Sequence, residues 1–285
     1  MKWETITMNE NLFKRNELLA EKTIKGLASR NMTGYYAATK EEALSRALSL
    51  IPEKSLVTMG GGMSVHEIGL VDALKAGAYD FLDRDEAADK RAAMLAAYDA
   101  DFYLASCNAL TDDGILINID GNANRVSAIA QGPRKVLFIV GINKICPDLD
   151  SAMKRARNVA APANIQRFAS LNPPCKKAGR CFDCKSPDTI CCQFLITRYS
   201  MHKDRIHVIL VNDALGFLGG CHDPGYRTAS PVQHVAAGQA RAARGFRHLR
   251  AGWPPACRGG GGRAAFPASA QSADVIGGKV PLLFG

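Results

Sequence analysis

The apolar positions of the chain follow two periods, and stretches with each period alternate over most of its length. Steps of three and four residues mark helices, as over 9–30, where Leu12, Leu19 and Leu27 fall on one face. Short apolar runs bounded by turn residues mark strands, as over 135–140. The pattern predicts helices over 9–30, 39–50, 64–74, 85–97 and 149–159, and strands over 35–38, 55–59, 79–82, 101–106, 115–119, 135–140 and 205–211. This alternation predicts an α/β fold, with a mostly parallel sheet flanked by helices on both faces.

The segment VTMGGGMSVHEIG joins a predicted strand to a predicted helix through three consecutive glycines. Gly60, Gly61 and Gly62 allow the backbone to turn sharply and to approach a ligand closely. Ser64 and Glu67 have the S-x-x-E spacing of a capping box, so we expect the helix to begin at Ser64. Free N–H groups at a helix N-terminus attract anions. The segment therefore predicts either a plain strand-to-helix turn or one wall of an anion-binding site.

Further polar residues follow three other predicted strands, namely Asn108, Asp120, Asn124, Arg125 and Lys144. The carboxyl ends of parallel strands meet at one edge of a sheet, where ligands of α/β proteins bind. We therefore expect these side chains to share a pocket with the glycine segment, with Arg125 holding a carboxylate or phosphate through two hydrogen bonds. The alternative is that Asp120 and the asparagines satisfy loop backbone groups, and that Arg125 pairs with Asp120.

Five of the nine cysteines fall between 175 and 192, with the spacing C-x5-C-x2-C-x6-C-C. Such density in a reducing compartment indicates metal binding rather than disulfides. Four thiolates, from Cys175, Cys181, Cys184 and Cys191, suit either zinc or an iron–sulfur cluster, and the spacing does not choose between them. Flanking Lys and Arg residues are expected to lower the thiol pKa values. The alternative is a loop of reduced or redox-active cysteines without a metal.

The composition is that of an ordinary globular protein, with 47% hydrophobic and 22% charged residues. The sequence has no run of about 18 apolar residues, so we expect no transmembrane helix. The first residues mix both charge signs and lack the apolar core of a signal peptide, which favours a cytoplasmic location. Basic and acidic residues are interspersed over the body of the chain, so the net charge of +9 does not indicate a nucleic-acid partner.

Most of that net charge lies in residues 218–285, where seven Arg and one Lys oppose two Asp. Pro and Gly make up 19 of these 68 residues, a level typical of low-complexity sequence. A periodic apolar pattern is nearly absent there. We interpret 218–285 as a disordered or out-of-frame extension, with a natural flexible tail as the alternative.

Three motifs of the body occur together in a known family. They are MGGGMSVHEIGL, SCNALTDDGILINIDGNANRVSAI and GPRKVLFIVGINKI. With them, residues 9–217, including the cysteine-rich loop 175–192, resemble the LUD domain of lactate utilisation proteins. The resemblance implies a Rossmann-like three-layer fold of the NagB/RpiA/CoA-transferase type. It also implies a role in oxidising L-lactate to pyruvate, alongside iron–sulfur subunits.

Three functional hypotheses follow for this chain. The first is a small-anion-binding component of lactate or 2-hydroxy acid oxidation, with the cysteines holding a metal or iron–sulfur cluster. The second is a transferase or isomerase for phosphorylated or CoA-linked substrates, with a structural zinc. The third is a non-catalytic regulatory or assembly subunit. The motifs G-x-G-x-x-G and G-x-x-x-x-G-K-[ST] are absent, which argues against NAD and against a P-loop nucleotide.

Overall fold

A computed structural model describes residues 10–216, so the interpretation of 218–285 lies outside the described residues. Its main sheet has six strands in the order β1 (Thr33–Ala37), β10 (Ile206–Val211), β7 (Lys135–Gly141), β4 (Phe102–Ala105), β2 (Leu56–Met59) and β3 (Asp80–Leu82). Every neighbouring pair in this sheet is parallel. The predicted parallel sheet is therefore confirmed.

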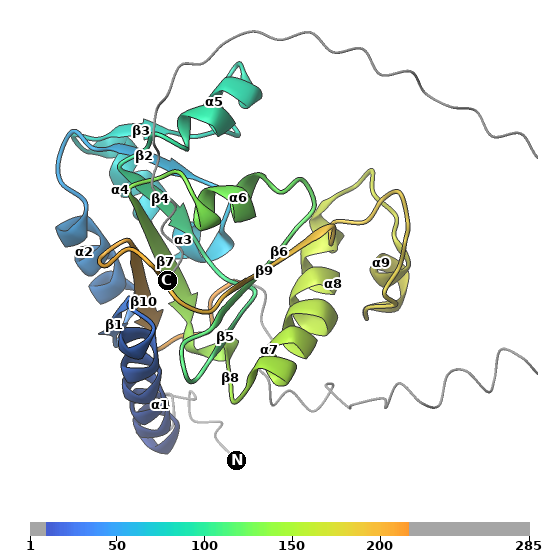
Figure 1. Cartoon of the computed structure of the whole chain (residues 1–285), viewed down its shortest axis with the longest axis horizontal. Coiled ribbons are helices and arrows are strands. Elements are labelled where there is room, and N and C mark those ends of the chain that lie inside the picture. The colour runs from blue at the N-terminus through green and yellow to red at the C-terminus, as the bar shows by residue number, and fades with distance from the viewer. Residues whose placement is uncertain (1–9, 217–285) are drawn as a thin grey trace, which may run out of the picture. The chain divides into compact units, whose positions relative to one another are not determined.

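Helices cover both faces of the main sheet. On β7, Val136, Phe138 and Val140 pack in a cluster with α1 (Glu10–Ser29) and α6 (Asn124–Ala130). The intervening Leu137 and Ile139 pack in a second cluster on the opposite face. That cluster contains α2 (Lys40–Leu50), α3 (Met63–Glu67) and α4 (Leu70–Ala76). Strand residues alternate between faces, so a continuous apolar run such as β7 supplies both layers. The predicted α/β arrangement with helices on both faces is thus present (Figure 1).

A second, mixed sheet packs against the first. Its order is β8 (Ile145–Cys146), β5 (Ala109–Thr111), β6 (Leu116–Asp120) and β9 (Gln193–Thr197), with β6 antiparallel to both of its neighbours. The strand expected over 115–119 is therefore real but lies in this sheet and not in the parallel one. The turn at Asp113 and Gly114 folds β6 back on β5, which removes it from the main sheet.

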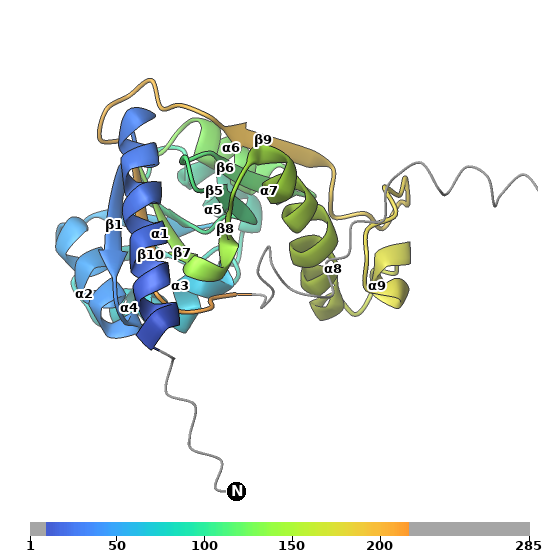
Figure 2. The same ribbon diagram turned by 90° about the horizontal axis from the view of Figure 1, so that it is seen from below.

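The remaining helical segments cover the second sheet and the edges. They are α5 (Lys90–Ala96), η1 (Ile142–Lys144), α7 (Leu149–Arg155), the π-helical η2 (Ala156–Ala160), α8 (Ala161–Asn164), η3 (Ile165–Arg167) and α9 (Pro174–Ala178). Both views show α1 and α2 at one end of the fold and α8 and α9 at the other (Figures 1 and 2). Within the described range, no helix has the length and apolar character that crossing a bilayer requires.

Two predicted helices are shorter than expected. The helix over 64–74 is interrupted at Gly69, whose left-handed backbone (φ 75°) separates α3 from α4. The helix over 85–97 begins only at Lys90, because the Asp89 carboxylate accepts hydrogen bonds from the backbone N–H groups of Arg91 and Ala92 and so caps it there. In both cases a local backbone feature overrides the apolar periodicity.

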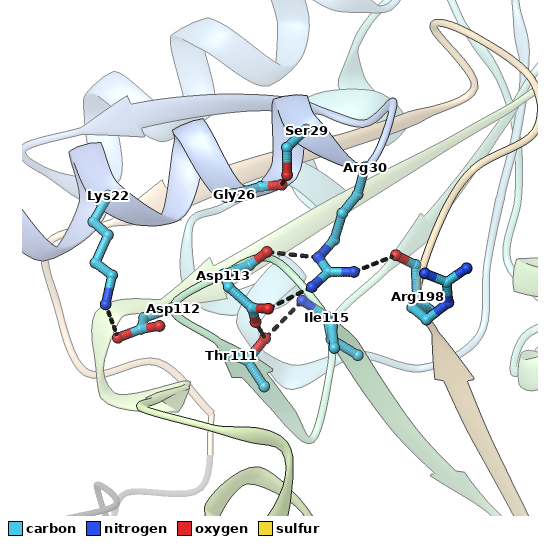
Figure 3. Close-up of polar contacts among 9 residues, drawn as sticks. All are labelled: Lys22, Gly26, Ser29, Arg30, Thr111, Asp112, Asp113, Ile115 and Arg198. Carbon is cyan, nitrogen blue, oxygen red and sulfur yellow. Dashed lines mark hydrogen bonds and ion pairs between the residues drawn. The ribbon is translucent and has the colours of Figure 1, made fainter.

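A close contact between α1 and the β5–β6 turn ties the N-terminal helix to the second sheet (Figure 3). Arg30 Nε donates to the backbone carbonyl of Asp113 at 2.6 Å, and its Nη1 donates to the carbonyl of Arg198 at 3.0 Å. A Cβ added at Gly26 would lie 2.6 Å from the carbonyl oxygen of Asp113. The helix therefore approaches the turn backbone to backbone, and only glycine fits at this position.

Replacing Gly26 with alanine is expected to destabilise the fold by about 1–3 kcal/mol, because the added methyl group overpacks against backbone that cannot move aside. Urea unfolding measures the change. Lys22→Ala on the same helix is the matched control, since its ion pair with Asp112 has an exposed lysine and such pairs contribute only about 0–1 kcal/mol. Equal stability of the two variants would contradict the backbone contact.

Candidate functional site

The glycine segment does not contain the expected capping box. Helix α3 begins at Met63 with Gly62 as its N-cap, and no side chain caps it. Ser64 is therefore inside the helix, and its Oγ lies 2.8 Å from Lys144 Nζ. Glu67 accepts a hydrogen bond from the backbone N–H of Gly216 at 2.7 Å. The capping prediction is wrong because a buried amine, distant in sequence, competes for the serine hydroxyl.

One pocket brings together six of the nine residues predicted to bind an anion: Gly61, Gly62, Ser64, Asn108, Arg125 and Lys144. Its other described lining residues are Met63, Ser106, Cys107, Arg155, Ala160, Asn164, Arg167 and Gly216. Gly61 adopts a left-handed backbone (φ 77°), which turns the chain from β2 toward α3. The pocket lies at the carboxyl ends of β2, β4 and β7, the edge that the sequence predicted. That an anion binds in this pocket stays a prediction.

Gly60, Asp120 and Asn124 do not line this pocket. The Asp120 carboxylate accepts hydrogen bonds from the backbone N–H groups of Arg125 at 2.9 Å and Val126 at 3.1 Å, so it caps the start of α6. This is the structural alternative that the sequence left open. Asn124 is the first residue of α6, and a Cβ at Gly60 would lie 2.8 Å from Arg125 Cγ. The structure thus gives Gly60 and Asp120 a role in positioning Arg125.

Lys144 and Arg155 are the most deeply buried cations of the pocket, with 6% and 1% of their surface exposed. Lys144 Nζ is 2.8 Å from both Ser64 Oγ and Ser106 Oγ. Burial lowers the pKa of Lys144 to about 8, and Arg155 adds to the decrease while Cys107 opposes it. Arg155 donates to the backbone carbonyls of Asn143 and Asn108. Both cations are held in place by neutral oxygen atoms of the fold.

Arg125 and Arg167 offer donors that the fold does not use. Arg125 Nη2 donates to the Ile119 carbonyl, and its buried Nε forms an ion pair with the Asp120 carboxylate at 3.9 Å, as the structural alternative expected, but makes no hydrogen bond. Across residues 10–216, Arg167 forms neither a hydrogen bond nor an ion pair, and its guanidinium stacks on the Phe168 ring at 5.0 Å. Burial lowers the pKa of Arg167, and the charge of Arg125 lowers it further against the effect of Asp85. These guanidinium groups repel one another, so an anion between them would be stabilised.

A second pocket brings together all four predicted metal ligands, Cys175, Cys181, Cys184 and Cys191. Cys175 lies on α9, and the other three lie in the loop that leads to β9. The fifth cysteine of the cluster, Cys192, is exposed and is not among the residues that line this pocket. The local C-x5-C-x2-C-x6-C spacing thus folds into one cysteine-lined cavity, next to the aromatic rings of Phe182 and Phe194.

The thiols of this cysteine pocket are harder to ionise than the sequence suggested. Burial raises the pKa of Cys191 to about 12, and the neighbouring cysteines raise it further. The pKa of Cys175 is raised for the same two reasons. The expectation of lowered pKa values is wrong for these two residues, because the flanking cations point elsewhere. Lys176, for example, donates to the backbone carbonyls of Phe168 and Leu171.

The donor set of the cysteine pocket fits a thiophilic metal, since four cysteines share one cavity. The side chains are not drawn together around a common centre. Among the described residues, no three His, Cys, Asp or Glu side chains are grouped closely enough to hold a metal ion. The ligand assignment therefore stays a prediction.

One helical stretch, from α7 through η2 to α8, separates the two pockets. Arg155 and Ala160 face the anion pocket, whereas Arg157 and Ala161 line the cysteine pocket. Arg157 is 2.5 Å from the Asp183 carboxylate and 3.7 Å from Cys181 Sγ, so it fastens the cysteine loop to this stretch. Because η2 is π-helical, with an i→i+5 repeat, Arg155 and Ala160 recur on one face, and Arg157 lies on another.

Among the pocket residues that escaped the sequence-based prediction, Ser106, Arg155 and Arg167 matter most for the chemistry of the site. Ser106 directly follows β4, so its place at a strand end was a usable signal. Arg155 and Arg167 belong to a helical stretch rich in basic residues, where the sequence does not distinguish the buried Arg155 or the more exposed Arg167 from fully solvated arginines. Only the fold identifies them, because α7 packs on β5 and β8, and η3 continues from α8, so that both arginines line the pocket.

Comparisons with known proteins give a family and similar solved structures. Residues 20–211 match the sequence profile of the LUD domain. The crystal structure of a DUF162 family protein from Deinococcus radiodurans is similar at 15% identity, covering 70% of this chain and 98% of that one with a TM-score of 0.41. No curated protein matches the sequence.

Proposed function

This chain belongs to the LUD-domain family, and on that premise we propose that it binds the carboxylate of lactate or a related 2-hydroxy acid as a component of their oxidation. The observation that carries the proposal is the charge of the anion pocket. Arg125, Lys144, Arg155 and Arg167 line it, and none of its described lining residues is Asp or Glu. Positive charges gathered around one small pocket, two of them on the largely buried side chains of Arg125 and Lys144, favour an anion there.

The two guanidinium groups are the proposed carboxylate ligands. Arg125 has a buried Nε that makes no hydrogen bond, although it lies 3.9 Å from the Asp120 carboxylate, and the Arg167 side chain has no hydrogen bond within the described range. A guanidinium binds a carboxylate through two parallel hydrogen bonds, which also orients it. Lys144 and Arg155 lie deeper and supply positive potential. This division of roles supports a ligand that carries its charge at one end and a small polar group at the other.

The second part of the proposal concerns the cysteine pocket, where Cys175, Cys181, Cys184 and Cys191 would hold an iron–sulfur cluster or a zinc ion. Thiolates are the ligands that both prefer. An iron–sulfur cluster bound there would supply one-electron transfer, whereas zinc would be structural. The chain's own contribution is to place the four cysteines around one cavity: α9 carries Cys175, and the ion pair of Arg157 with Asp183 holds the loop.

L-lactate is expected to raise the unfolding temperature of the full-length protein, because a ligand that binds only the folded state stabilises it. The uncharged amide of the same acid, lactamide, is the matched control and should have no effect, since it lacks the charge that the arginines would bind. Differential scanning fluorimetry over a range of both compounds provides the measurement. Equal shifts with lactate and lactamide, or none with either, would contradict a carboxylate site.

A further inference from the structure

Ser64, Ser106 and Lys144 form a hydrogen-bonded trio on the anion pocket that 2-hydroxy acid binding does not require. Lys144 Nζ lies 2.8 Å from each serine Oγ, and the two Oγ atoms are 3.4 Å apart. All three side chains are buried, and all three line the pocket. They come from α3, the end of β4 and η1, which are rigid parts of the sheet edge.

The two serines of the trio are not equivalent. Ser106 Oγ donates to the backbone carbonyl of Ile139 at 2.7 Å, so its single proton already takes part in a hydrogen bond. Among the described residues, the hydrogen-bond partners of Ser64 Oγ are Lys144 Nζ and Ser106 Oγ, and neither is a carbonyl that would hold its proton. Ser64 is therefore the hydroxyl whose proton is available to the amine. Ser106 holds that amine in place by accepting a hydrogen bond from it.

We propose that Ser64 is a nucleophile for acyl transfer, with Lys144 as its general base and Ser106 as the residue that positions Lys144. The substrate class is an ester or thioester whose acyl group carries a carboxylate. A serine activated by an adjacent amine within hydrogen-bond reach is a known arrangement for such chemistry. The anionic acyl group is inferred from Arg125 and Arg167 on the same pocket, so this part rests on the proposed function.

The reaction begins when Ser64 Oγ attacks the carbonyl carbon, while the hydroxyl proton moves to the neutral amine of Lys144. The tetrahedral adduct then collapses, the bond to the leaving oxygen or sulfur breaks, and Lys144 returns the proton to the departing alcohol or thiol. Water attacks the acyl ester of Ser64 in the second half, again losing its proton to Lys144. This second adduct collapses, the bond between Ser64 Oγ and the acyl carbon breaks, and Lys144 returns the proton to Ser64 Oγ as the carboxylic acid leaves.

The surroundings of Lys144 keep its neutral form accessible. The charged and titratable groups that face it are Cys107, Arg155, Glu67 and Arg125. Burial and the two arginines lower the pKa of Lys144 to about 8, against Cys107 and Glu67. A Cβ at Gly216 would lie 3.2 Å from both Lys144 Nζ and Ser64 Oγ, so the backbone there covers the pair. The rate of acylation should therefore rise with pH through about 8, as the amine loses its proton.

The test uses the full chain and an activated ester that carries a free carboxylate, mono-4-nitrophenyl succinate, with neutral 4-nitrophenyl butyrate as the matched probe. We expect a burst of nitrophenolate, a succinyl group on Ser64 by peptide mapping, and weaker labelling by the neutral ester. Ser64→Ala and Lys144→Met should each reduce the burst rate at least about 100-fold. Ser106→Ala should shift the pH at which the burst rate rises, an effect that a purely structural role of Ser106 would not produce.

Circular dichroism and the lactate-dependent unfolding temperature show whether each variant is folded and binds anions. Wild-type protein that acquires no succinyl group, but whose unfolding temperature still rises with lactate, would overturn the nucleophile and leave the proposed function intact. A succinyl group on Ser64 with no effect of lactate on the unfolding temperature would support the nucleophile and overturn lactate binding. A label on Cys107 or on surface lysines, or an undiminished burst in Ser64→Ala, would also overturn the assignment. Equal labelling by the two esters would overturn the anionic substrate class.

Discussion

Arg167→Ala is expected to weaken L-lactate binding by about tenfold to a hundredfold, as measured by isothermal titration calorimetry. A hydrogen bond between charged groups contributes about 1.5–3 kcal/mol, and about 1.4 kcal/mol corresponds to a tenfold change in affinity. The variant reports on binding rather than folding, because within the described residues the Arg167 side chain stacks on the Phe168 ring but forms no hydrogen bond and no ion pair. Truncation therefore removes a ligand donor while the fold loses little.

Arg134→Ala is the matched control for this prediction. Its side chain is 80% exposed and lies 3.5 Å from the Asp101 carboxylate, away from the pocket lining. Removing it changes the net charge of the protein by the same amount, so any general electrostatic effect on lactate binding is reproduced. Equal losses in Arg134→Ala and Arg167→Ala would show that net charge, and not the pocket, governs affinity. Unchanged binding in both variants would exclude Arg167 as a ligand.

Cys191→Ser is expected to lose its bound metal, whereas the neighbouring Cys192→Ser retains it. Cys191 lines the cysteine pocket with three other cysteines, and Cys192 is exposed, with its Sγ 3.8 Å from the Thr189 carbonyl. Loss of one of four thiolates leaves a tetrahedral site incomplete. Protein purified without oxygen is analysed for iron, zinc and acid-labile sulfide, and its visible absorption spectrum is recorded. Iron with sulfide identifies a cluster, and zinc alone identifies a structural site.

The pairing of adjacent cysteines makes this comparison selective. Both variants remove one thiol from the same short segment, so oxidation and handling affect them alike. Equal metal content in Cys191→Ser and Cys192→Ser would contradict the ligand assignment. Wild-type protein without any metal would support the alternative of a loop of reduced cysteines. Either result leaves the prediction for Arg167 untouched, because the two pockets use different residues.

The main sheet was predictable because most of its strands have a recognisable pattern in the local sequence. Runs such as β7 and β10 are buried on both faces, and a continuous apolar run is the direct signature of that environment. The second sheet was not predictable from the same signal. β5 and β8 have only three and two residues, and β6 pairs with β9 across about 75 residues of chain. Such short or distant pairings leave no periodic trace.

The residues of the candidate site also fall into a set that the sequence predicts and a set that it does not. Gly61, Asn108, Arg125 and Lys144 follow strand ends, and the topology of a parallel sheet collects such positions at one edge. The capping box of Ser64 and Glu67 was misread because the spacing is local, whereas the partner that captures Ser64 lies 80 residues away. The cysteine cluster could be recognised without knowledge of the fold, because its proposed ligands are close in sequence.

The helical stretch between the pockets has a consequence for how the protein would respond to its two ligands. Arg155 and Arg157 are parts of one continuous rod, interrupted only by the wider π-helical turn of η2. If filling the cysteine pocket rotates or shifts this rod, the affinity of the anion pocket changes by some factor. Thermodynamic linkage then requires that the anion change the metal affinity by the same factor. A π-turn, which is less regular than the helix around it, is a natural place for that adjustment to occur.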